Sequence, residues 1–182
     1  FGGSIKDFDC APYLSAKEAR RMDVFIQYGL AAGVQAVTDS GLLDSPLDYE
    51  RVGVAIGSGI GGINSIEDTS NLVRTSGPRK VSPFFVPGSI INMLGGTLSI
   101  RYNFQGPNIA ITTACTTGTH NIGVAANMIC AGQADVMLAG GAEMATSPVG
   151  LGGFCAARAL STRNDDPQSA SRPWTKTVTD SC

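Results

Sequence analysis

The sequence predicts an α/β fold, in which a largely buried sheet is covered by helices on both faces. Short apolar segments with the length of buried strands alternate with longer segments whose apolar residues recur at helical intervals. Gly77-Pro78 and Ser82-Pro83 interrupt this alternation, and no linker or repeat divides it. We therefore expect one domain, or part of one.

The first element is expected to be a single helix at 15–41. Ser15 and Glu18 have the spacing of a capping box, apolar residues follow at helical intervals, and Gly41 ends the pattern. The remaining elements are expected, in order, as a strand at 52–56, a helix at 63–73, a helix at 90–100, a strand at 109–111, a helix that begins near Thr116 or Thr117, and a strand at 136–139.

Composition limits the functional classes. The 182 residues carry a net charge of −2, and 15% of them are charged, against about 25% in an average soluble domain. So few charges suggest surface that is hidden against another subunit or a missing segment, and a low-charge monomer is the alternative. With no charged-then-apolar leader and no apolar run of about 20 residues, we expect a cytoplasmic protein without a membrane partner. The five cysteines are widely spaced and odd in number, which indicates neither a metal site nor a disulfide framework.

Cys115 is the most informative residue. It lies between the apolar segment 109–111 and a helical segment rich in small residues. A thiol at a helix N-terminus meets unpaired N–H groups and the positive end of the helix dipole, which favour the nucleophilic thiolate. We interpret this turn as a nucleophile elbow. A buried structural cysteine is the alternative.

The turn after the strand at 52–56 contains Gly57, Gly59 and Gly62, which match the dinucleotide-binding pattern G-x-G-x-x-G. A nucleotide-binding module of this type also needs an acidic residue about 20 positions further on. The segment 69–134 contains no Asp or Glu. These glycines are therefore expected to allow close approach of neighbouring backbone or substrate.

His120 is the only histidine, and it follows Cys115 by five positions. That offset turns its side chain away from the face of Cys115, so we interpret it as structural. Lys17, Arg20 and Arg21 are spaced along the first turns of the first helix. Cations there oppose the helix dipole and hint at an anionic partner, although a solvated polar face has the same pattern.

The segment 106–122 resembles the active-site signature of the β-ketoacyl-acyl carrier protein synthases, the condensing enzymes of fatty-acid synthesis. Further stretches resemble the bacterial type II synthases: 21–29 (with Arg21-Met22-Asp23), 57–62, 77–87, Gly140-Gly141-Ala142-Glu143 and 159–165. The resemblance implies the first half of a thiolase-like, αβαβα layered fold. It also implies an acyltransferase that transfers an acyl chain to Cys115 and then performs a decarboxylative Claisen condensation with malonyl-acyl carrier protein.

Site roles follow from the same resemblance. Ile60 and Phe154 correspond to acyl-pocket and gate residues, and Phe85 to a pocket wall lent by the second subunit of a homodimer. Lys17, Arg20, Arg21 and Arg158 correspond to positions that bind the acidic acyl carrier protein. No cofactor is implied, because the substrates are carried on the phosphopantetheine of that protein, and no nucleic-acid partner is expected.

The departures from the family pattern concern completeness. The two histidines and the lysine that assist decarboxylation come from the second half of such enzymes, and they are absent here, as is the first strand. We therefore expect residues 1–174 to form a partial N-terminal domain, a fragment that is inactive in condensation by itself. The tail 175–182 matches the family's usual Asp-Lys-Asp-Arg-Asp-Gly-Phe-Val continuation after deletion of one base, so we interpret it as aberrant and out of frame.

Two further functions are open besides the nucleotide-binding module. A ketosynthase domain of a polyketide synthase would use the same chemistry. A non-catalytic subunit of the chain-length-factor kind would characteristically lack the cysteine, and Cys115 argues against it.

Overall fold

The computed structural model describes residues 1–44, 46–172 and 174. The chain divides into two compact units. One comprises Asp9–Met144, and the other comprises Phe1–Phe8 with the described residues of Ala145–Cys182. The proposed out-of-frame tail at 175–182 lies outside the described residues.

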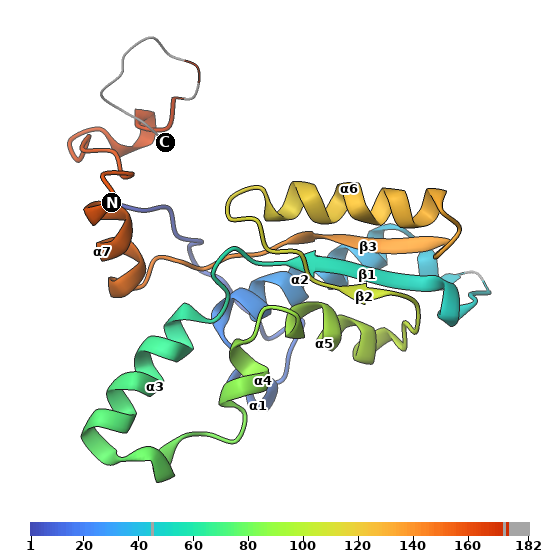
Figure 1. Ribbon diagram of the computed structural model, residues 1–182, viewed down its shortest axis with the longest axis horizontal. Helices are drawn as coiled ribbons and strands as arrows, with labels where there is room; N and C mark the ends of the chain where they lie inside the picture. The colour runs from blue at the N-terminus through green and yellow to red at the C-terminus, as the bar shows by residue number, and fades with distance from the viewer. Residues whose placement is uncertain (45, 173, 175–182) are drawn as a thin grey trace. The chain divides into compact units, whose positions relative to one another are not determined.

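A three-stranded parallel sheet forms the centre of the larger unit. Its order is β2 (Asn108–Ile109), β1 (Val52–Gly57), β3 (Val136–Gly141). Helix α6 (Thr117–Cys130) lies on one face, and α5 (Met93–Tyr102) covers β1 on the other (Figure 1). All six residues of β1 are buried, so the prediction of a buried strand with helices on both faces is confirmed for this central strand. The expectation of a largely buried sheet is wrong for the two outer strands, because β2 and β3 contain only half-buried and exposed residues.

Helix α2 (Val24–Asp39) packs against α5 through two glycines. A Cβ atom at Gly29 would lie 2.4 Å from Leu94 Cδ2, and one at Gly33 would lie 2.8 Å from Leu98 Cδ1. Both leucines are fully buried as a result. Burial of a leucine side chain contributes about 1.5–3 kcal/mol, so this close contact is a major part of the core.

The prediction of one helix at 15–41 is wrong, because the segment forms two. The capping box of Ser15 and Glu18 starts α1 (Ala16–Ala19), as expected, but this helix ends after one turn. Asp23 then takes an extended conformation and caps α2, since its side chain accepts a hydrogen bond from the Phe25 N–H. Its other oxygen accepts from the Ser65 N–H at 2.7 Å, which links α2 to α3 (Ile63–Ser76). The break therefore serves a tertiary contact.

The helix expected at 90–100 begins later. A short helix, α4 (Phe85–Ser89), precedes it, and Ile90 is extended with ψ of 142° before α5 starts at Met93. The helix expected at 63–73 is longer and runs to Ser76, where Gly77 with φ of 83° ends it. The described residues also form 3₁₀ turns, η1 (Leu42–Asp44), η2 (Tyr49–Arg51), η3 (Pro78–Lys80) and η4 (Pro167–Ser169).

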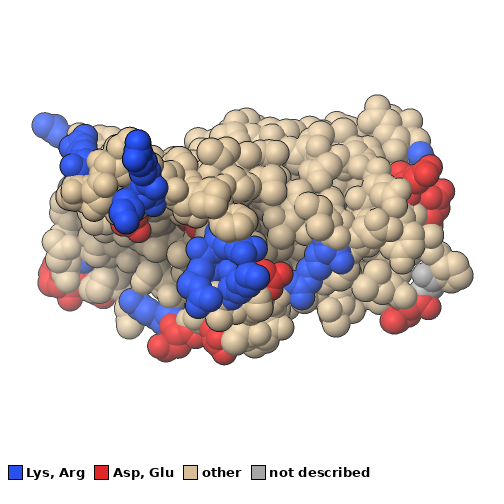
Figure 2. Space-filling model, turned by 90° about the horizontal axis from the view of Figure 1, so that it is seen from below, with Lys and Arg blue, Asp and Glu red and all other residues tan. Residues whose placement is uncertain are grey.

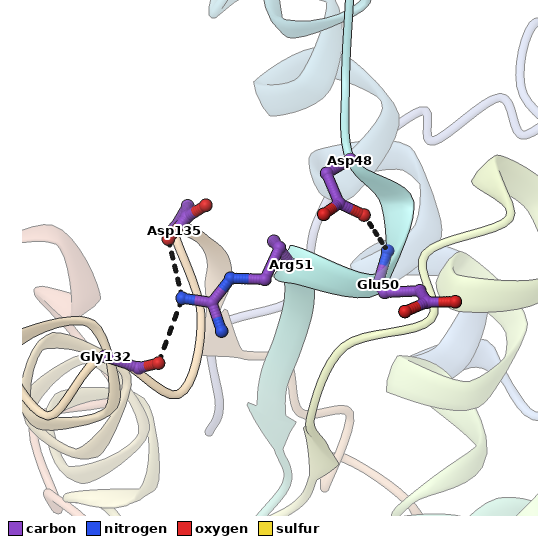
Figure 3. A network of polar contacts seen from close by, with 5 residues as sticks. All are labelled: Asp48, Glu50, Arg51, Gly132 and Asp135. Carbon is purple, nitrogen blue, oxygen red and sulfur yellow. Dashed lines mark hydrogen bonds and ion pairs between the residues drawn. The ribbon is translucent and has the colours of Figure 1, made fainter.

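A polar network joins the starts of β1 and β3 at the surface (Figure 3). The Arg51 guanidinium donates to Asp135 Oδ1 at 2.7 Å and to the Gly132 carbonyl at 2.9 Å. This hydrogen bond and the charge of Arg51 hold the pKa of the Asp135 carboxyl below its usual range, and the same bond raises the pKa of Arg51. The pair ties the two strands together before their parallel ladder begins.

The smaller unit contains α7 (Pro148–Ala156). Ser147 caps it by accepting from the Gly150 N–H, and Pro148 occupies the first helical position, which needs no N–H donor. A Cβ at Gly2 would lie 3.2 Å from the Leu151 side chain, so the N-terminal segment passes beside this helix. Among the described residues, no helix combines the length and apolar character needed to cross a membrane.

Candidate active site

Cys115 lies in the turn between β2 and α6, as the sequence predicts. It is solvent-exposed and directly precedes Thr116, the N-cap of α6. Its other neighbour, Ala114, has φ of 52°, a left-handed conformation that non-glycine residues adopt only when their surroundings hold them there. The alternative of a buried structural cysteine is wrong, because the thiol-bearing residue is exposed.

Asn121 fixes the start of this turn. Its amide is fully buried, accepts from the Ile111 N–H at 3.1 Å, and donates to the Ile111 carbonyl at 2.9 Å. It also donates to the Thr117 carbonyl within α6 at 2.8 Å. The Asn121 side chain thereby hydrogen-bonds to both the N–H and the carbonyl of Ile111. In the expected strand at 109–111, these two groups would have bonded to a neighbouring strand. The strand consequently ends at Ile109, and that prediction is wrong at its C-terminal end.

Thr117 fixes the rest of the turn. Its Oγ1 accepts from the Thr113 N–H at 2.9 Å and donates to the Ala114 carbonyl at 2.7 Å. Thr116 Oγ1 donates to the Thr113 carbonyl at 2.9 Å. Together these side chains hold the left-handed backbone just before Cys115 and account for its stability. A strand-turn-helix with an exposed thiol held this way has the geometry of a nucleophile elbow, and the turn is called the elbow below.

Glu143 fixes the glycine-rich loop 57–62, which follows β1. One carboxylate oxygen accepts from the Ile60 N–H at 2.8 Å, and the other accepts from Ser58 Oγ at 2.9 Å and the Gly61 N–H at 3.2 Å. Glu143 follows β3, so the two parallel strands bring these groups to one edge of the sheet. The loop N–H groups, which a phosphate would need, already have an internal anion as partner.

The glycine loop and the elbow lie against each other. A Cβ at Gly57 would lie 2.1 Å from the Ile111 carbonyl oxygen, and one at Gly59 would lie 3.3 Å from the Ala114 carbonyl oxygen and 2.7 Å from Glu143. The expectation that these glycines permit close approach of neighbouring backbone is confirmed. Ile60 therefore sits on a loop that touches the segment carrying Cys115.

His120 donates to or accepts from Thr113 Oγ1 through Nδ1, at 2.7 Å. It is exposed on the first turns of α6 and has a partner within the elbow. Its structural role stays a prediction. Among the described residues, no three His, Cys, Asp or Glu side chains gather as metal ligands do.

The other predicted acyl-pocket residues lie elsewhere. Phe85 starts α4 and is half-buried beside a cavity of about 200 Å³ that Arg20 and Arg21 also line. Phe154 is 39% exposed on α7 of the smaller unit. Within the larger unit the structure brings Ile60 to the elbow.

The basic residues expected to bind a carrier protein are exposed. Lys17 and Arg20 lie on and just after α1, and the Arg21 guanidinium stacks over the Phe84 ring at 4.0 Å. Because α1 ends at Ala19, Arg21 is not helical, and the predicted helical spacing of these cations is wrong. Arg158 is exposed after α7 in the smaller unit. Figure 2 shows a group of basic side chains near the middle of the face seen from below.

Glu18 lies among these cations. Hydrogen bonds from the Ser15 hydroxyl and backbone N–H, with a smaller effect of Arg101 and Arg21, hold the pKa of Glu18 below its usual range. This carboxylate therefore stays ionised well into mildly acidic solution and partly offsets the local positive charge.

Asn121 and Glu143 were not predicted from the sequence as functional residues. A signal for each exists: Asn121 follows Thr117 by one helical turn on the face that meets the sheet, and Glu143 lies two positions after the glycine pair that ends β3. Neither sequence position predicts the hydrogen-bond partner, because Asn121 binds Ile111 and Glu143 binds Ile60, and both partners lie in other segments.

Comparison with known proteins places this site in a family. The family model described as 'Beta-ketoacyl synthase, N-terminal domain' matches residues 2–180 of the sequence. The chain therefore belongs to the β-ketoacyl synthase family. The chain is 62% identical over 176 residues to 3-oxoacyl-[acyl-carrier-protein] synthase 2 of Vibrio harveyi, covering 97% of this chain and 42% of the relative. It is 58% identical over 172 residues to the protein of that name from Coxiella burnetii, covering 94% and 42%. The chain thus spans less than half of these relatives.

Solved structures agree on the fold. A β-ketoacyl synthase from Burkholderia phymatum superposes with a TM-score of 0.82 at 28% identity, covering 97% of this chain and 43% of that one. A structure of a type II PKS acyl-carrier protein in complex with its ketosynthase bound to the hexaketide gives 0.79 at 31% identity, covering 86% and 45%. The predicted α/β, thiolase-like fold class is confirmed.

Proposed function

We propose that this chain is the nucleophile-bearing part of a 3-oxoacyl-acyl carrier protein synthase that elongates fatty acids. The observation that carries the proposal is the exposed Cys115, held by Asn121 and Thr117 at the start of α6 in a member of the β-ketoacyl synthase family. The relatives from Vibrio harveyi and Coxiella burnetii, which are 62% and 58% identical to this chain, are named for this activity.

The first step is acyl transfer. The Cys115 thiolate attacks the thioester carbonyl of an acyl carrier protein, and the phosphopantetheine thiolate leaves and takes up a proton. The backbone N–H of Cys115 is the proposed donor to the developing oxyanion, in keeping with its place before a helix. The elbow holds the nucleophile in advance, so little reorganisation is needed during the reaction.

The second step is condensation in the complete protein. Malonyl-acyl carrier protein loses carbon dioxide, its new carbanion attacks the Cys115 thioester, and the Cys115 thiolate leaves. The product is a 3-oxoacyl chain two carbons longer on the carrier protein. The residues that assist decarboxylation are proposed to lie in the remainder of the complete protein, since this chain covers 42% of its Vibrio harveyi relative.

The acyl chain needs an apolar channel beside Cys115. Ile60, on the loop that touches the elbow, is the proposed pocket residue in the larger unit, and Phe154 is the proposed gate. Phe85 is proposed to serve the pocket of a second copy in a homodimer, which fits its position beside Arg20 and Arg21 instead of at the elbow. This chemistry requires no cofactor of the chain's own.

Acyl carrier protein is the proposed partner. Lys17, Arg20 and Arg21 are exposed in the larger unit, and opposite charges speed association with an acidic protein. Arg158 is the proposed fourth contact. One structural relative at 31% identity is a complex of a ketosynthase with its acyl-carrier protein. The cytoplasmic location and the absence of membrane and nucleic-acid partners stay predictions.

The polyketide alternative has weaker support, because that structural relative is 31% identical whereas the fatty-acid relatives reach 62%. The nucleotide-binding module is disfavoured, because the Glu143 carboxylate already binds the loop N–H groups.

The proposal is tested by incubating the chain with hexadecanoyl-acyl carrier protein and mapping covalent mass by peptide mass spectrometry. We expect a hydroxylamine-sensitive hexadecanoyl adduct on Cys115 that is absent from Cys115→Ala and retained in Cys130→Ala, which removes another exposed thiol. An adduct on another cysteine, or none, would contradict the proposed nucleophile.

A further inference from the structure

The Glu143 carboxylate has an unusual set of partners. Both of its oxygens accept hydrogen bonds from the loop 58–61, two of them from backbone N–H groups and one from a hydroxyl. Ser58 Oγ also accepts from the Gly61 N–H at 3.1 Å, which closes the loop on itself. Glu143 itself is exposed, so these bonds are not required to bury its charge.

The partners surround Ile60. Its own N–H binds one carboxylate oxygen, and the N–H of the next residue binds the other. Gly59 directly precedes Ile60. Because Gly59 has no side chain, its backbone fits between Glu143 and the Ala114 carbonyl. On the other side, a Cβ at Gly61 would lie 2.6 Å from the Ile91 side chain. Ile60 is thus the large apolar residue of a loop held between Glu143, the elbow and the segment after α4.

We infer that Glu143 is a positioning residue for acyl-chain selection: its carboxylate fixes the loop 58–61, and thereby the place of Ile60 next to the elbow of Cys115. The inference rests on the proposed function, in which Ile60 lines the acyl pocket. Glu143 does not touch the reacting atoms in this role. It acts through the backbone of Ile60, and it affects which acyl chains fit more than it affects the thiol.

The substitution Glu143→Gln tests this role with little change in volume. A glutamine has one acceptor oxygen, so it keeps either the Ile60 bond or the bonds to Ser58 and Gly61, and its NH₂ group then faces N–H donors. Glu50→Gln is the matched control, because Glu50 lies on η2 at the opposite end of β1.

The experiment compares transfer of hexanoyl and hexadecanoyl groups from carrier protein to Cys115, together with alkylation of Cys115 by iodoacetamide. We expect Glu143→Gln to change the ratio of the two acylation rates by at least about fivefold, because small displacements of pocket groups alter such ratios strongly. Alkylation by the small reagent should stay within about twofold of the wild-type rate, since the elbow keeps its own contacts. Glu50→Gln should match the wild type in both.

A second measurement reports directly on the hydrogen bonds of the loop 58–61. Amide hydrogen exchange at Ile60 and Gly61 should be at least about tenfold faster in Glu143→Gln, with the amides of β1 unchanged. If Glu143→Gln does not fold, Ser58→Ala takes its place. It removes one donor to Glu143 and one acceptor of the Gly61 N–H, and it should shift the acylation ratio in the same direction by a smaller factor.

The outcomes separate the two claims. A wild-type chain that acylates Cys115, together with variants whose acylation ratio equals the wild-type ratio, would overturn the role of Glu143 and leave the proposed function standing. A wild-type chain that takes no acyl group would overturn the proposed function, and this inference with it.

Discussion

Replacement of Asn121 by alanine is expected to loosen the elbow and destabilise the larger unit. The substitution removes three hydrogen bonds, to the Ile111 N–H, the Ile111 carbonyl and the Thr117 carbonyl. A typical bond contributes about 0.5–1.5 kcal/mol net, and a buried group left without a partner costs about 1–3 kcal/mol. Ile111 is half-buried and Asn121 is fully buried. The expected loss in the free energy of unfolding is therefore about 2–4 kcal/mol.

The assay is urea unfolding, with Asn127→Ala as the matched control. Asn127 lies on the exposed side of the same helix, so its replacement should change the free energy of unfolding by less than about 0.5 kcal/mol. Below the unfolding transition, iodoacetamide should alkylate Cys115 more slowly in Asn121→Ala, whereas Cys130 at the end of α6 should react at the wild-type rate. Equal stability of the two variants would refute the reasoning that the side-chain amide holds the turn.

Three further outcomes are expected. Asp23→Ala should lower the free energy of unfolding by about 2–4 kcal/mol, because it removes the cap of α2 and leaves the Ser65 N–H without its partner; urea unfolding beside Asp39→Ala, an exposed position of the same helix, measures it, and equal losses would contradict it. Arg51→Ala should raise the pKa of the Asp135 carboxyl towards its ordinary value, as followed by NMR titration; a depressed carboxyl contributes stability above its unfolded-state pKa that is lost as pH falls through its folded-state pKa, so the variant should lose less stability on acidification than the wild type does. The chain alone should form no 3-oxoacyl product from acyl- and malonyl-acyl carrier protein, because it spans 42% of its relatives and holds a single histidine; product found by mass spectrometry would contradict this.

Local patterns predicted the local structure well. The capping box at Ser15, the buried strand that became β1 and the start of α6 all depend on residues within a few positions of one another. The position of Cys115 before a helix follows from the same kind of signal. These features could be inferred because the physical cause lies within the segment itself.

The errors share a different cause. The first helix breaks at Asp23 because that carboxylate binds the Ser65 N–H, 42 positions away. The strand before Cys115 is cut short because a side chain of α6 takes the backbone groups of Ile111. Glu143 reaches a loop 82 to 85 positions earlier. In each case a side chain binds backbone groups of a segment distant in the sequence, and periodicity carries no information about such a contact.

The most direct test of the central claim is a ranking of thiol reactivity in the folded chain. Limited alkylation with iodoacetamide at neutral pH, followed by peptide mass mapping, compares Cys115 with the other cysteines in one sample. Cys130 and Cys155 are exposed as well, so exposure alone would label all three at similar rates. The elbow before α6 predicts that Cys115 is labelled first. Faster labelling of Cys130 or Cys155 would contradict its assignment as the nucleophile.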